Sequence, residues 1–413
     1  MKFALVCAYC RLREEASTAG RRCSECDGPF VVEVDRPALT DARDVPAEAG
    51  LPGIWRYLPL LPLERRDAIV SLHEGGTPLV AARRLGERIG VSSLFLKDES
   101  RNPTGSFKDR MLALGVSRAV ELGKSTIVVQ SSGNVAAAAA AYAAKAGLRA
   151  KIFVPRTVPE EKLLQIQLYG GDLFRIDHDS PAAVFRLMDE VAKALGWYVV
   201  STTALYNPFT LEGARTIAYE LFEQTGGELP EWIVVPVGGG GNLGTIWRAF
   251  RELNELGLVD RLPRMVGVQA EGCAPFVEAV RLGRSAEETA KIRWPEIRTV
   301  CGPIADDVVF DAHVALPAVR ESFGTAVAVS DTETLDAEAM LARMEGVFVE
   351  PSSATTIAAL RRLAMEGIVR QESSVCCILT GTGFKDMASA RKIVSLPDLV
   401  APTVEAVLDR AEA

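Results

Sequence analysis

Three short segments of this 413-residue chain place glycines, hydroxyl residues or a lysine where a predicted strand gives way to a helix. The first reads Asn102-Pro103-Thr104-Gly105-Ser106-Phe107-Lys108-Asp109-Arg110. Lys108 falls in the first turn of the predicted helix, where the helix dipole disfavours a positive charge. We expect this placement to lower the pKa of its amine and to favour nucleophilic chemistry. The structural alternative is a surface lysine on an amphipathic helix.

The second segment, Gln130-Ser131-Ser132-Gly133-Asn134, ends a predicted strand and starts a helix. Backbone N–H groups at such a turn bind anions, typically a carboxylate or a phosphate. The Asn134 amide can also donate a hydrogen bond to a polar ring substituent. The alternative is a simple helix cap, a position that Ser and Asn favour.

The third segment, Val237-Gly238-Gly239-Gly240-Gly241-Asn242, again joins a predicted strand to a helix. Successive glycines expose backbone N–H groups with no side chains in the way, which suits a phosphate. The loop lacks the lysine and hydroxyl of a nucleoside-triphosphate P-loop, and it lacks the glycine spacing of dinucleotide sites. It therefore indicates the phosphate of some other group; a flexible glycine turn is the alternative.

Four of the eight cysteines lie near the N-terminus as two pairs, Cys7 with Cys10 and Cys23 with Cys26. Each pair can present two thiolates from one tight turn, and two such turns complete a tetrahedral sulfur site. The spacing predicts a structural zinc-ribbon-like segment over residues 1–35, because a closed site leaves zinc no open position for catalysis. The alternatives are ordinary reduced cysteines or a remnant that has lost its metal.

Together these segments resemble the tryptophan-synthase-β superfamily of pyridoxal 5′-phosphate (PLP) enzymes, fold type II, and within it the threonine synthases. The resemblance covers roughly residues 72–390. It rests on GGTPLV (75–80), KDESRNPTGSFKDR (97–110), SSGN (131–134), NP…LEGARTIAYE (207–220), VPVGGGGN (235–242), EPSSA (350–354) and LTGTGFKD (379–386).

The resemblance implies a role for each matching residue. Lys108 would carry PLP on its ε-amine as a Schiff base and later move protons. Asn134 would contact the pyridine 3′-oxygen and Thr380 the ring nitrogen, which a neutral hydroxyl leaves largely unprotonated. The cofactor phosphate would lie on Gly238, Gly239, Gly240, Gly241 and Asn242. The substrate would contact Thr104, Ser106, Ser131 and Ser132.

The resemblance also implies a carbon–oxygen lyase, a threonine synthase that converts O-phosphohomoserine and water to threonine and phosphate. A serine/threonine dehydratase and a β-replacement enzyme making an unusual amino acid are the enzyme alternatives. A PLP-fold regulatory or scaffold protein, with the ribbon as docking module, is the alternative from another class. The EPSSA and LTGTGFKD segments favour threonine synthase, and the intact Lys108 and glycine loop disfavour the non-enzyme.

Some positions depart from the threonine-synthase pattern. Ala204-Leu205-Tyr206 stands before Asn207-Pro208 where Asn-Ser is common, and Thr382 replaces the usual histidine of the late glycine loop. The segment from Thr299 to Pro303 also differs from the common alanine-rich form. These positions are expected near the substrate phosphate, for which the sequence offers three candidate cations: Arg110, Lys162 and Arg215.

The elements that position these segments alternate between strands and helices. Strands are predicted at 93–100, 125–130, 149–155, 197–201 and 231–237, with helices at 106–123, 134–147, 182–196 and 210–227. Strands separated by helices of this length predict βαβ units and a mainly parallel sheet covered on both faces. The predicted fold class is therefore α/β, a fold-type-II PLP enzyme with two lobes.

The expected larger, PLP-binding lobe comprises residues 72–112 and 215–395, and the smaller, mobile lobe residues 113–214. A linker is expected over 36–71, with a short helix near LPLLPLERRDAIV, and a tail or helix over 396–413. A net charge of −8 argues against a nucleic-acid partner. We read no signal peptide and no membrane span, so we expect a cytoplasmic enzyme of a small amino-acid substrate; the family implies a homodimer.

Overall fold

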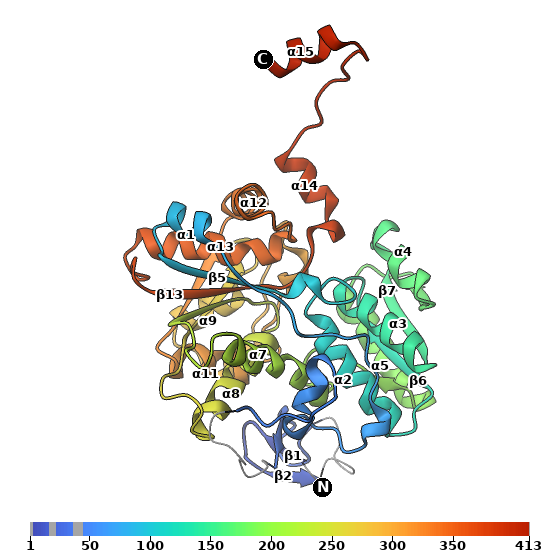
Figure 1. Ribbon diagram of the computed structural model, residues 1–413. Coiled ribbons are helices and arrows are strands. Elements are labelled where there is room, and N and C mark those ends of the chain that lie inside the picture. The colour runs from blue at the N-terminus through green and yellow to red at the C-terminus, as the bar shows by residue number, and fades with distance from the viewer. Residues whose placement is uncertain (1–2, 16–21, 36–43, 413) are drawn as a thin grey trace.

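The strands form three separate sheets in a computed structural model that describes residues 3–15, 22–35 and 44–412 (Figure 1). The first sheet contains the N-terminal strands β1 (Phe3–Cys7), β2 (Arg13–Glu15) and β3 (Phe30–Val34), in the antiparallel order β2-β1-β3. This sheet packs on the body through Phe3, whose ring meets that of Phe209 edge-on at 5.7 Å between centroids. The guanidinium of Arg118 lies over both rings.

The largest sheet has six strands in the order β12-β11-β10-β13-β5-β4. All its pairings are parallel except that of β4 with β5. Its central strands are buried, as expected for a parallel sheet that helices cover on both faces. The strands are β4 (Leu79–Ala81), β5 (Ser93–Asp98), β10 (Trp232–Pro236), β11 (Arg264–Ala270), β12 (Thr325–Val329) and β13 (Ser374–Leu379).

The third sheet is parallel, with the order β8-β7-β6-β9. Its strands are β6 (Thr126–Gln130), β7 (Arg149–Pro155), β8 (Asp172–Ile176) and β9 (Tyr198–Val199). Helix α3 (Asn134–Ala146) packs on this sheet with a row of buried alanines, whose small side chains allow a close approach. The second and third sheets, with helices packed on them, confirm the predicted α/β body with mainly parallel sheets.

Most predicted helices are present, and one is divided. The run predicted as a single helix over 210–227 consists of α6 (Pro208–Leu211), a 3₁₀ turn (Glu212–Arg215) and α7 (Thr216–Gln224). The other helices are α1 (Arg83–Ile89), α2 (Lys108–Glu121), α4 (Glu161–Leu168), α5 (Pro181–Leu195), α8 (Gly241–Glu255), α9 (Pro275–Arg281), α10 (Ala286–Lys291), α11 (Ala312–Glu321), α12 (Asp331–Met340), α13 (Pro351–Met365), α14 (Met387–Ile393) and α15 (Val404–Glu412).

The segment expected as a linker is packed like part of the body where it is described. Trp55, Tyr57 and Leu60 are fully buried in the main hydrophobic core. They belong to a 3₁₀ helix (Gly53–Leu60), and a second 3₁₀ turn spans Arg66–Ala68. Residues 36–43 lie outside the described residues.

A buried network of charges ties α2 to the large sheet and to α7. The fully buried Arg110 of α2 donates hydrogen bonds to both carboxylate oxygens of Glu99 and to both of Glu220. Glu220 also accepts from Lys97 Nζ at 2.7 Å. Because every member has an opposite charge as partner, the network holds the start of α2 without leaving a buried charge unpaired.

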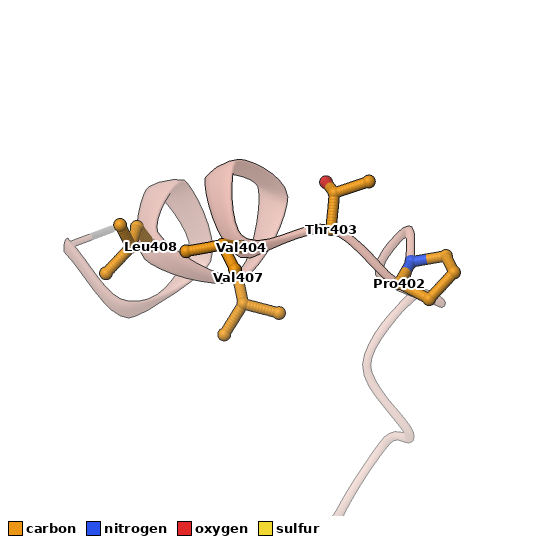
Figure 2. A pocket seen from close by; sticks show the side chains of 5 residues that line it. All are labelled: Pro402, Thr403, Val404, Val407 and Leu408. Atoms are coloured by element: carbon orange, nitrogen blue, oxygen red, sulfur yellow. The ribbon is translucent and has the colours of Figure 1, made fainter.

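The C-terminal residues extend away from the rest of the molecule (Figure 1). Leu396 and Leu399 are almost fully exposed there. An apolar hollow on α15 is lined by Pro402, Thr403, Val404, Val407 and Leu408, all from one short stretch of chain (Figure 2). Across the described residues, every helix is too short or too polar to cross a membrane.

Candidate active site

The three segments singled out in the sequence meet at the carboxyl ends of parallel strands. The glycine loop follows β10, and Ser131 to Gly133 follow β6. The residues after β13 bond to the loop before α2, because Phe107 N donates to Thr380 O at 3.0 Å and Thr382 N donates to Gly105 O at 3.0 Å. This edge is where open α/β sheets bind ligands.

Lys108 begins α2, as the sequence predicted. Within the described residues its ammonium has no hydrogen bond or ion pair, and it lies 4.5 Å from the centre of the Phe107 ring. Desolvation by the surrounding protein lowers its pKa to about 8, opposed by the charges of Asp306, Asp311 and Glu350. A lysine with this pKa supplies free amine near neutral pH, as a nucleophile or proton carrier requires.

Lys97 lies nearby in β5 but is fully engaged. Its ammonium donates to Glu220 Oε2 at 2.7 Å, to Thr77 O at 2.8 Å and to Gln224 Oε1 at 2.8 Å. These acceptors use all three of its protons. Lys97 is therefore a structural cation, and Lys108 is the lysine with a free amine at this edge.

The glycine loop has no room for side chains at several positions. A Cβ on Gly238 would meet Asp306 Oδ2 at 2.6 Å, and one on Gly240 would meet Ala315 Cβ at 2.7 Å. Gly240 also has a φ of +97°, which disfavours any other residue. Burial raises the pKa of Asp306, and the backbone of Gly239 opposes that shift, so this carboxyl lies against the glycine loop.

Two buried polar groups beside this loop lack hydrogen-bond partners within the described residues. These groups are the Asn242 side-chain amide, through both Nδ2 and Oδ1, and the Asp311 carboxyl, through Oδ2. Burial raises the pKa of Asp311 to about 7, while its Oδ1 accepts from Ala204 N at 2.8 Å. Buried atoms of this kind normally have partners, so they indicate a ligand site.

Asn134 lies at the start of α3 between groups of opposite charge. Its Oδ1 accepts from Lys385 Nζ at 2.8 Å, and its Nδ2 donates to Glu350 Oε2 at 3.2 Å. Thr380, at the end of β13, has its hydroxyl 3.0 Å from that of Ser353. Glu350 is 3% exposed, and burial raises its pKa.

The four residues expected to contact substrate divide into two groups. The Thr104 hydroxyl donates to Asp109 Oδ2 at 3.0 Å, whereas the buried Ser106 hydroxyl has no partner within the described residues. Ser131 and Ser132 are partly exposed at the turn before α3, and Ser131 Oγ accepts from Gly133 N. Their contact with substrate remains a prediction.

The four N-terminal cysteines converge on one point. Their sulfur atoms all lie within 4.8 Å of one another, with Cys7 and Cys26 at 3.4 Å and Cys10 and Cys23 also at 3.4 Å. Sulfurs about 2.3 Å from a central zinc ion in a tetrahedron lie about 3.8 Å apart. The spacing therefore fits a tetrahedral metal site.

The comparisons with known proteins agree with this geometry. The family model described as "Pyridoxal-phosphate dependent enzyme" matches residues 70–381. The chain belongs to this family. This PLP enzyme is 38% identical to the threonine synthase of Methanosarcina acetivorans, over 98% of this chain and 97% of that one. It is 40% identical to the threonine synthase of Methanocaldococcus jannaschii, over 82% of each chain.

Solved structures support the fold alone. The PLP enzyme resembles a threonine deaminase from Solanum lycopersicum with a TM-score of 0.66 and 21% identity, covering 77% of this chain and 82% of that one. It resembles maize serine racemase with a TM-score of 0.65 and 24% identity, covering 76% and 92%.

The residues present fit PLP. An amine without a hydrogen-bond partner, a glycine loop without room for side chains and an Asn amide match an aldehyde, a phosphate and a ring oxygen. Four acidic or basic residues beside these groups, Asp306, Asp311, Glu350 and Lys385, were missed by sequence reasoning. EPSSA and LTGTGFKD contained two of them, but only the fold brings all four to Lys108 and Asn134.

Two of the three cations expected near the substrate phosphate are already engaged. Arg110 is enclosed by Glu99 and Glu220, and Arg215 donates to Glu212 and Glu252. Since both are buried in these ion pairs, neither is available to a substrate anion. Lys162 on α4 is exposed and makes no ion pair within the described residues.

Proposed function

We propose that this PLP enzyme is a threonine synthase, converting O-phosphohomoserine and water to threonine and phosphate. The observation that carries the proposal is the Lys108 amine, which makes no hydrogen bond or ion pair within the described residues. Asp306, Asp311 and Glu350 surround it, and the glycine loop lies against Asp306. The identity with threonine synthases over most of the chain directs the choice of substrate.

Lys108 would hold the cofactor through its ε-amine, the glycine loop and Asn242 its phosphate, Asn134 its 3′-oxygen and Thr380 its ring nitrogen. When bound, PLP draws electrons away from the substrate's α-carbon. Lys108 Nζ takes and returns protons at that carbon and at the neighbouring β-carbon. Its lowered pKa allows both directions of transfer near neutral pH.

The substrate α-carboxylate would be received by Ser131, Ser132 and the N-terminus of α3, where the helix dipole favours an anion. Ser106 forms a β-bridge with Gly381, and its hydroxyl, which has no partner within the described residues, would donate to the substrate. Thr104 would contact the substrate while its hydroxyl stays bonded to Asp109, which fixes the direction of that hydroxyl.

We expect phosphate release from O-phosphohomoserine to exceed ammonia release from serine or threonine. The measurement is product analysis with each substrate separately, on the purified full chain. This test is demanding because Ala204, Leu205 and Thr382 depart from the threonine-synthase pattern where the substrate phosphate is expected. A phosphate dianion needs several hydrogen-bond donors to replace its water. Rapid deamination without phosphate release would replace this function by the dehydratase or β-replacement alternative.

The proposal includes a structural zinc ion bound by Cys7, Cys10, Cys23 and Cys26. We expect about one zinc per chain in protein purified under reducing conditions, because four thiolates close a tetrahedral site. Metal analysis of wild type, Cys10→Ser and the control Cys273→Ser checks this: only the first substitution removes zinc, and both variants keep the cofactor absorbance. Wild-type protein with no zinc would contradict the assignment.

We also propose that the division expected from the sequence holds, with residues 113–214 as a smaller lobe that moves against the larger one. The third sheet, β8-β7-β6-β9, falls wholly within that range. A homodimer in the cytoplasm, as the family resemblance implies, is part of the same proposal.

A further inference from the structure

We propose that Lys385 is a positioning residue that fixes the orientation of the Asn134 amide, so that Nδ2 is the atom presented to the cofactor ring. The inference rests on the cofactor site proposed above. It assigns a function to the last motif of the sequence, LTGTGFKD, whose lysine the proposed mechanism does not use.

The argument begins with the two neighbours of the amide. Lys385 Nζ lies 2.8 Å from Asn134 Oδ1, while the Glu350 carboxylate oxygens lie 3.2 and 3.4 Å from Nδ2. An ammonium group can only donate hydrogen bonds, and an ionised carboxylate can only accept them. Rotating the amide by 180° would place its N–H groups against the ammonium and its oxygen against the carboxylate.

This arrangement matters because the two ends of an asparagine amide have nearly the same shape. Packing alone does not choose between them; hydrogen-bond partners do. If Oδ1 faced the ring oxygen, two acceptors would meet with no proton between them. Because Lys385 occupies Oδ1, Nδ2 remains as the donor for the cofactor's 3′-oxygen.

The backbone is shaped to bring Lys385 to this place. A Cβ on Gly105 would lie 3.4 Å from Lys385 Cε and 2.8 Å from Thr382 Cγ2. The Gly105 φ of +85° also disfavours other residues. Gly105 O accepts from Thr382 N, so the loop before Lys108 and the loop carrying Lys385 form one joined structure. The lysine stem therefore crosses the gap that the glycine leaves open.

Two substitutions separate charge from packing. Lys385→Met keeps the unbranched stem without a donor, and Lys385→Arg keeps the charge. For the Met variant we expect PLP affinity to fall about tenfold, as loss of one charge-assisted interaction predicts, and the absorption maximum of bound PLP to shift. Lys385→Arg should restore both in large part. Lys392→Met, on the exposed surface of α14, is the matched control and should match wild type.

A double-mutant cycle then asks whether Lys385 acts through Asn134. In an Asn134→Ala background, Lys385→Met should change PLP affinity and spectrum no further. An undiminished tenfold effect there would overturn the inference, because Lys385 would then contact the cofactor directly. Wild-type affinity and spectrum in the single Met variant would overturn it too. Neither result touches the proposed function, which fails separately if the wild-type protein releases no phosphate from O-phosphohomoserine. A wild-type protein that binds no PLP would overturn both.

Discussion

Lys108→Ala is expected to abolish turnover and the near-visible absorbance of the bound cofactor. Proton transfer by a positioned base alone contributes roughly 10²–10⁴ to the rate, and the same lysine also holds the cofactor covalently. We therefore expect a loss of at least about a thousandfold. Absorbance spectra and product assays of the purified variant measure it. Lys145→Ala, exposed on α3, is the control and should behave as wild type.

The assignment of Lys108 as the lysine that holds the cofactor depends on its amine having no other partner within the described residues. Lys97 has three acceptors for three protons, and Lys385 is held by Asn134. Borohydride reduction of the holoenzyme, followed by peptide mass spectrometry, should therefore place the cofactor on Lys108. A tag on Lys97 or Lys385 would show that the site is built around another residue.

Arg110→Met is expected to lower the free energy of unfolding by about 3–5 kcal/mol, the usual cost of removing one partner from a buried ion pair. Its guanidinium bonds to all four carboxylate oxygens of Glu99 and Glu220, which are themselves buried. Without it, Glu220 keeps its ion pair with Lys97, whereas Glu99 has no cation partner left within the described residues. Denaturant unfolding, followed by circular dichroism, measures the change.

Arg251→Met is the matched control, because Arg251 is an arginine on the surface of α8 that also pairs with two glutamates, Glu255 and Glu321. Exposed pairs contribute at most about 1 kcal/mol, so its unfolding midpoint should stay near that of wild type. If both variants lost equally little stability, the buried network would be a packing feature and not an electrostatic one. Arg110→Lys should not restore stability, because an ammonium cannot bond to two carboxylates in the same forked geometry.

Local patterns in the sequence predicted much of the fold. The strands around Val128 and Val234 and the helix that starts at Lys108 follow from apolar runs and glycine ends, and all are present. The divided helix over 208–224 was not predicted, although Gly213 lies inside the 3₁₀ turn at Glu212–Arg215 and a glycine weakens a helical pattern. Strand β8 and helix α4 were also missed, since the half-exposed residues of β8 give a weak strand pattern.

The site was predictable only as far as its motifs are local. Lys108, Asn134 and the glycine loop each lie at a strand-to-helix junction, so spacing alone pointed to them. Asp306 and Asp311 lie in a stretch without such a pattern, and their approach to Lys108 depends on the packing of the strands and on α11. Arg110 illustrates the opposite error. It lies in a conspicuous motif and was expected near the substrate phosphate, but it is paired with a glutamate in the core.

The strand order of the largest sheet has a consequence for how the chain is made. β13 is the last strand in sequence, yet it lies between β10 and β5 and joins them. Until the ribosome has delivered residues 374–379, the sheet exists as two separate pieces, β5 with β4 and β10 with β11 and β12. The strands beside the gap are apolar and carry unpaired backbone groups, which is the kind of edge on which chains aggregate. Closing the sheet therefore waits until β13 has been synthesised and has left the ribosome.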